Sequence, residues 1–147
     1  MSAWSNIAYV IAGIALAVHG DYVPALGLTF LGIASYTGHT YGGKWWYLDW
    51  AGMYVAMIAI ISHNIGLPLI FWLVALPAVL LTLRYRFDSL TLTGALWCAC
   101  VGTAYLCGLP IVIPVIIFAI ALGFRQYGHI GHDVWHILTA TGFYLLV

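Results

Sequence analysis

The sequence predicts an all-α integral membrane protein, a seven-transmembrane helix bundle that forms a single domain over residues 1–147. The chain of 147 residues is 65% hydrophobic and only 5% charged, whereas soluble domains are about 25% charged. Its apolar residues fall into seven segments that are separated by short breaks. Because backbone polar groups cannot stay unpaired in hydrocarbon, segments of this kind are expected to be helices.

The seven segments follow one another with loops too short to hold a further domain. Each has about 16 to 19 residues, which is near the lower limit for a helix that crosses a bilayer. The fifth break is needed because residues 91–124 would otherwise form one unusually long span. The segments are expected at 4–19, 23–40, 48–63, 67–84, 89–107, 109–124 and 131–147. The breaks between them lie at 19–21, 41–44, 63–66, 84–88, 108–110 and 125–129, and each contains glycine, proline or a charged side chain.

The four basic residues all fall in loops on one side of the predicted bundle. Lys44 follows the second segment, Arg84 and Arg86 follow the fourth, and Arg125 follows the sixth. Because cytoplasmic loops carry an excess of Lys and Arg, this side is expected to be cytoplasmic, with the N-terminus on the same side and the C-terminus outside. The net charge is zero, and without a basic patch no nucleic-acid partner is expected.

Five polar side chains share that side of the predicted bundle. Ser35 and His39 lie four residues apart at the end of the second segment, and Asp49 begins the third. His132 and His136, again four apart, begin the seventh. Residues four apart share one face of a helix, and ionisable residues within a membrane are candidates for function. The histidines at positions 19 and 63 fall on the opposite side and are excluded from this group.

Three imidazoles with one open coordination position are the ligand set of a catalytic zinc ion. His39, His132 and His136 are therefore predicted metal ligands, and Zn²⁺ is the predicted cofactor. A zinc ion activates water and polarises a carbonyl group. Asp49 is a candidate to accept the proton of that water, and Ser35 is a candidate to hydrogen-bond the developing oxyanion.

Other roles are open for the same residues. The two histidines of the seventh segment can also be ordinary interfacial side chains, Ser35 can serve helix packing, and Asp49 can be the N-cap of the third helix. Asp133 points about 100° away from its neighbour His132 around a helix, and is expected to favour the helix N-terminus rather than a metal. A haem held by two histidines would leave Asp49 and the third histidine unexplained.

The ordered set of polar residues resembles the CREST superfamily of seven-span membrane hydrolases, which includes the alkaline ceramidases and the progestin and adipoQ receptors. The likeness is carried by three stretches, GIASYTGH at 32–39, LDWAGM at 48–53 and HDVWH at 132–136. The Ser-Asn pair at 5–6, just ahead of an apolar run, is a weaker fourth point of likeness. Together these points extend over nearly the whole chain in order and spacing.

The resemblance implies a zinc-dependent lipid amidase or esterase. His39, His132 and His136 would hold the zinc, with Asp49 and Ser35 beside the water. The implied reaction is hydrolysis of an amide bond in a ceramide-like membrane lipid or of an ester bond in a glycerolipid. The alternative is a receptor-type seven-span protein, which would bind a lipid or fatty acid at a structural zinc without turnover.

Overall fold

The computed structural model describes residues 3–87 and 89–147, and the regular structure in these residues is all helical. Every predicted segment corresponds to one α-helix, with boundaries that agree within three residues. In chain order the helices are α1 (Ile7–His19), α2 (Tyr22–Tyr41), α3 (Trp46–Asn64), α4 (Pro68–Tyr85), α5 (Leu90–Leu106), α6 (Val112–Phe124) and α7 (Gly128–Tyr144). Two short 3-10 helices, η1 (Ala3–Asn6) and η2 (Gly43–Trp45), precede α1 and α3.

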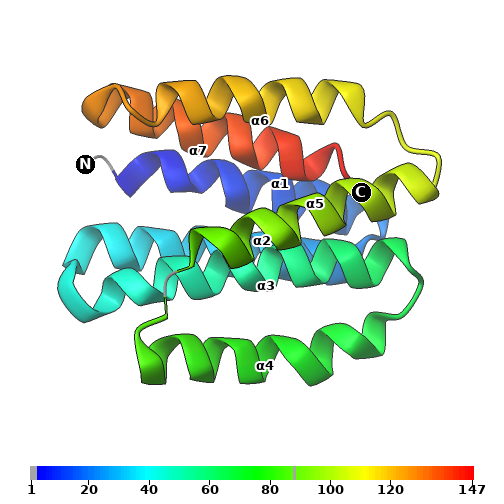
Figure 1. Ribbon diagram of the computed structural model, residues 1–147, viewed down its shortest axis with the longest axis horizontal. Coiled ribbons are helices and arrows are strands. Elements are labelled where there is room, and N and C mark those ends of the chain that lie inside the picture. The colour runs from blue at the N-terminus through cyan, green and yellow to red at the C-terminus, as the bar shows by residue number, and fades with distance from the viewer. Residues whose placement is uncertain (1–2, 88) are drawn as a thin grey trace.

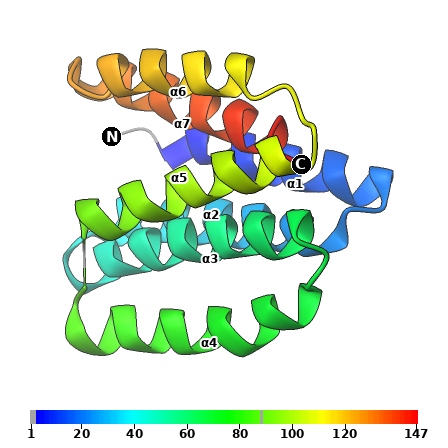
Figure 2. The ribbon, with the colours of Figure 1, turned by 45° about the vertical axis from the view of Figure 1, so that its right-hand side comes forward.

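The helices run side by side, with α4 at one edge and α6 at the other (Figure 1). The helix α3 packs against α2, α4 and α5, while α1 joins this group to α7 through its contacts with α2 and α7. The helix α6 packs on α7, but α5 has few neighbours in α6 or α7. In Figure 2 the first turns of α5 lie apart from α6 and α7, whereas its last turns reach the C-terminal end of the chain. This separation positions the cavity described below.

The ends of the helices follow the chemistry of the residues at the breaks. Gly20 ends α1 with a φ of 95°, a left-handed conformation that favours glycine. Pro68 lies in the first turn of α4, where a missing N–H group removes no helical hydrogen bond. Ser89 caps α5, because its hydroxyl accepts a hydrogen bond from the backbone N–H of Leu92 at 3.1 Å. Local signals therefore place these turns where the sequence predicts them.

Two glycines allow neighbouring helices to approach closely. A Cβ added at Gly27 of α2 would lie 2.6 Å from the Cβ of Ala59 in α3. A Cβ added at Gly142 of α7 would lie 2.6 Å from the ring of Phe118 in α6. Real Cβ atoms do not tolerate such distances, so small residues hold these two helix pairs together, as is common in membrane bundles.

The outer faces of the bundle are apolar. Side chains such as Ile11 in α1, Leu73 in α4 and Ile116 in α6 are more than half exposed. The helix α4 is long and apolar enough to cross a membrane, and no second helix in the described residues meets both conditions. The apolar stretches Trp4–His19, Thr91–Leu106 and Val112–Phe124 are shorter. The prediction of an all-helical fold is confirmed. Of the seven predicted membrane spans, only α4 meets the criteria of length and hydropathy among the described helices.

All four basic residues lie at one end of the bundle, which we call the basic end. Lys44 belongs to η2, Arg84 to the last turn of α4, Arg86 follows α4 and Arg125 follows α6. The turns from α2 to α3 and from α6 to α7 share this end with the N-terminus, whereas the C-terminus lies at the other end (Figure 1). The predicted arrangement of the loops is confirmed. That the bundle lies in a membrane, and that the basic end faces the cytoplasm, stay predictions.

Candidate metal centre

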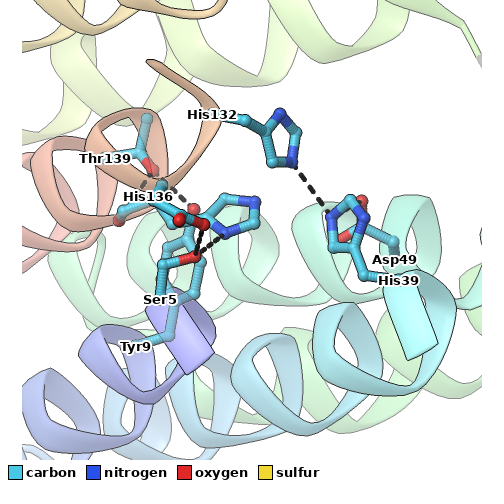
Figure 3. A network of polar contacts seen from close by, with 8 residues as sticks. Ser5, Tyr9, His39, Asp49, His132, His136 and Thr139 are labelled. Atoms are coloured by element: carbon cyan, nitrogen blue, oxygen red, sulfur yellow. Dashed lines mark hydrogen bonds and ion pairs between the residues drawn. The ribbon is translucent and has the colours of Figure 1, made fainter. Parts of the chain in front are cut away.

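Three imidazole rings meet at the basic end of the bundle (Figure 3). His39 comes from the last turn of α2, and His132 and His136 come from the first half of α7. One ring nitrogen of each histidine lies within 4.8 Å of the other two. The side chain of His39 is 1% exposed and His136 is buried. The grouping predicted from the sequence is confirmed, and the three side chains lie close enough to bind one metal ion.

One pair of ring nitrogens has about the separation that two ligands of one zinc ion need. The Nε2 atom of His132 is 3.2 Å from the Nε2 atom of His39. Two nitrogens that bind a tetrahedral zinc ion at its usual bond length are about 3.3–3.4 Å apart. A metal ion would accept both lone pairs, whereas without one a ring must donate an N–H group to the other. The donor set therefore fits a tetrahedral cation with one position open.

Packing fixes the position of His39. The ring of Trp46, at the start of α3, contacts it edge-on, with the two ring centroids 5.1 Å apart. The Nδ1 atom of His39 is buried and has no hydrogen-bond partner in the described residues. Metal-binding histidines usually donate their second nitrogen to a neighbouring group. His39 departs from that pattern, because the contact with Trp46 takes the place of a hydrogen bond at Nδ1.

Asp49 lies beside His39, and Ser35 lies next to Asp49. The Oδ2 atom of Asp49 is 3.7 Å from the Nε2 atom of His39, and its side chain is 15% exposed. Asp49 is not the N-cap of α3, because the helix begins at Trp46. The buried Ser35 interacts with the Asp49 carboxylate, although no hydrogen bond of standard geometry joins its hydroxyl to a described residue. A carboxylate thus adjoins the candidate ligands, with the Ser35 hydroxyl next to that carboxylate.

Hydrogen bonds through Ser5 and Asp133 fix the tautomer of His136. The Ser5 hydroxyl donates a hydrogen bond to the Oδ1 atom of Asp133 at 2.9 Å, and its oxygen lies 2.9 Å from the Nδ1 atom of His136. Because the single hydroxyl proton goes to Asp133, the Ser5 oxygen accepts the Nδ1 proton of His136. The Nε2 atom of His136 then keeps its lone pair for a metal ion. Asp133 therefore supports the site from outside the histidine cluster, consistent with the prediction that it is not a ligand.

Replacing Ser5 with alanine is expected to weaken zinc binding by about 10- to 100-fold, because the Nδ1 proton of His136 loses its acceptor. The Ser5→Thr variant keeps the hydroxyl and should recover most of the affinity. Ser62→Ala is the matched control, since Ser62 is a buried helical serine that bonds only carbonyl groups of its own helix. The measurement is competition for Zn²⁺ against a chelating dye with the purified protein. Equal affinity in the Ser5→Ala and wild-type proteins would contradict the assignment.

A contact between Tyr9 and Thr139 joins α1 to α7 beside His136. The Tyr9 hydroxyl and the Thr139 hydroxyl form a buried hydrogen bond. Thr139 also donates to the backbone carbonyl of Trp135, one turn earlier in α7. The ring of Tyr9 lies 5.8 Å from that of His136, centroid to centroid. The contact fixes the position of α1, and η1 directly before it brings the Ser5 hydroxyl to His136.

The metal centre adjoins a cavity of about 500 Å³. The cavity lies between α3, α5, α6 and α7, and the side chains that line it are mostly apolar or aromatic. On α3 its lining extends from Trp46 to Met57, and on α7 from His132 to Phe143. Eleven residues of helix rise on the order of 16 Å, so the cavity is long and leads away from the polar groups. Binding sites for small molecules typically have about 300–1,000 Å³ and such a mixed lining.

Several residues of the site escape prediction from the sequence. In the sequence, Ser5 is marked only by the weak family likeness of the Ser-Asn pair at 5–6, and Tyr9 and Thr139 belong to no spacing pattern. Trp46 and Trp50 lie in an aromatic run of the kind that marks a membrane interface, yet both line the cavity. Such contacts depend on which helices pack together, and local patterns do not reveal that.

No protein-family model, no curated protein and no solved structure matches this chain. The class of site is therefore defined by its own geometry. It is a cluster of three histidines with an adjacent carboxylate, and it lies at the polar end of a long apolar cavity in an all-helical bundle.

Proposed function

We propose that this chain is a seven-span membrane hydrolase of the CREST type, which uses a zinc ion to cleave an amide or ester bond of a lipid. The observation that carries the proposal is that the candidate metal centre opens onto the apolar cavity. His132, His136 and Asp49 all line the apolar cavity, so a group that reaches the candidate metal centre comes from a molecule with an apolar body. This combination favours a lipid substrate over a small polar one.

The outward faces of the helices support a membrane environment. Monomeric soluble proteins rarely expose large contiguous apolar patches, whereas lipid covers such surfaces. The helices α2, α3, α4, α5 and α7 have 17 to 20 residues and are about 26–30 Å long, close to the thickness of a hydrocarbon core of about 30 Å. Shorter helices are accommodated by local thinning of the bilayer. On α4, for example, five large apolar side chains are 57–65% exposed: Leu69, Trp72, Leu73, Leu76 and Leu80.

The positions of the basic residues favour one orientation. Because Lys and Arg gather in cytoplasmic loops, the basic end would face the cytoplasm, together with the N-terminus and the metal centre. The C-terminus would then lie outside. A lipid in the cytoplasmic leaflet would present its acyl carbonyl at about the depth of the three histidines.

The residues of the site have distinct roles in the proposed reaction. His39, His132 and His136 would hold a zinc ion, which when bound supplies a Lewis acid that polarises the acyl carbonyl and makes water a stronger nucleophile. Asp49 accepts a proton from the attacking water and passes it to the leaving nitrogen or oxygen. Ser35 orients the Asp49 carboxylate or donates to the oxygen on which negative charge develops. The acyl C–N or C–O bond breaks, and a fatty acid and an amine or alcohol leave.

The proposal is tested on the purified protein by metal analysis and by incubation with labelled ceramides and glycerophospholipids. About one zinc per chain is expected, and fatty acid should be released at a rate that falls to background after zinc is removed with a chelator and returns when zinc is added back. Tight lipid binding with zinc but without release would identify the receptor-type alternative. A protein that holds no zinc would refute both.

A further inference from the structure

Arg125 brings a positive charge to the polar end of the cavity. It follows the last residue of α6 and lines the cavity together with Asp49 and His132. Of the Lys and Arg side chains in the described residues, Arg125 is the one that lines it. Its charge is close enough to act on both the Asp49 carboxylate and the His132 ring. The basic group and the candidate metal centre therefore belong to one site.

The position of the guanidinium group is defined by α7. The Cζ atom of Arg125 lies 5.5 Å from the centroid of the Trp135 ring, which lines the same cavity. Stacking of this kind orients an arginine while its N–H groups stay free to bind a ligand. Within residues 3–87 and 89–147, no carboxylate forms an ion pair with Arg125. An arginine that stacks on a ring and forms no ion pair with a described carboxylate is suited to an anionic ligand.

The other three basic residues differ from Arg125 in this respect. Lys44, Arg84 and Arg86 do not line the cavity; Lys44 lies over the Trp45 ring and Arg84 over the Tyr85 ring. They are positioned to contact lipid headgroups around the bundle, as basic residues next to a membrane commonly do. Arg125 thus differs from the other basic residues because it lines the cavity. A role in attracting the protein to anionic membranes would not require that position.

We propose that Arg125 binds the anionic headgroup of the substrate, so that the cavity selects acyl lipids with a phosphate or carboxylate a few bonds from the acyl carbonyl over neutral lipids such as ceramide. The acyl chain lies along the apolar cavity, with Met53, Met57 and Phe118 among its contacts. The carbonyl then lies at the histidines and the negative charge at Arg125. The identity of the reacting bond rests on the proposed function, but the preference in binding does not.

The test measures binding rather than turnover, using full-length Asp49→Asn protein in detergent so that the ligands stay intact. One pair of ligands is 1-acylglycerol 3-phosphate and the 1-acylglycerol of the same chain length, and a second pair is an N-acylglycine and the matching N-acylethanolamine. We expect the charged member of at least one pair to bind about 10- to 100-fold more tightly. The pair that shows the preference tells whether the headgroup is a phosphate or a carboxylate.

The Arg125→Gln variant should abolish this preference and leave the affinity for the neutral ligands within about twofold. Arg84→Gln is the matched control, because it removes a charge at the same end of the bundle but outside the cavity. It should keep the preference. Equal affinity for charged and neutral ligands, or a preference that survives in Arg125→Gln, would overturn the proposal. A preference for the charged ligands in a protein that hydrolyses no lipid would instead refute the proposed function and leave this assignment standing.

Discussion

Substituting His132 with alanine is expected to abolish stoichiometric zinc binding. The variant loses one of three protein ligands and the ring that lies 3.2 Å from His39. Changes in groups that only support a ligand already cost about 10- to 100-fold in metal affinity, so loss of a ligand itself should raise the Kd by well over 100-fold. The metal content of protein purified in detergent, together with dye competition, measures the effect.

The control for this substitution lies on the same helix. His129 is one turn earlier in α7, is exposed and does not belong to the cluster of three histidines. His129→Ala should therefore keep one zinc per chain and an unchanged affinity. Far-UV circular dichroism would check that both variants retain their helices. One zinc per chain in His132→Ala, or equal loss in both variants, would be inconsistent with the proposed ligand set.

The sequence predicts the histidine cluster because two simple rules suffice for it. Spacing of four residues places His132 and His136 on one face of a helix. The succession of seven short-looped helices then brings the end of the second helix to the same end of the bundle as the start of the seventh. Neither rule needs knowledge of side-chain packing. The structure bears out both, since His39 and the two histidines of α7 meet at the basic end.

The hydrogen bonds that support His136, and the cavity beside it, depend on helix packing that these two rules do not specify. The contact between Ser5 and His136 joins residues 131 positions apart and exists because η1 and α1 pack on α7. The position of Asp133 around the helix keeps it out of the predicted ligand set, but its acceptor role toward Ser5 follows only from the packed structure. The cavity likewise exists because α5 packs on α3 and leaves space toward α6 and α7. Apolar helices of similar length carry no local signal for these choices.

Replacing Asp49 with asparagine is expected to lower the turnover of a lipid substrate by about 100- to 10,000-fold, the usual contribution of a positioned acid or base. The substitution keeps the size of the side chain but removes the group that accepts a proton. Zinc should stay bound, because the metal is expected to rest on the three histidines and the Asp49 carboxylate is 3.7 Å from the nearest of them. The loss should therefore appear in kcat, with metal content unchanged.

The combination of readouts separates the roles that Asp49 could have. If Asp49→Asn loses zinc along with activity, the carboxylate is a ligand rather than a proton acceptor. If turnover and zinc are both retained, the carboxylate has a structural role. Asp21→Asn is the matched control, because Asp21 also faces a histidine, with its Oδ1 atom 3.5 Å from the Nε2 atom of His63, but at the opposite end of the bundle. Its turnover should match that of the wild type, since a carboxylate beside a histidine acts in hydrolysis only where the cavity delivers the acyl carbonyl.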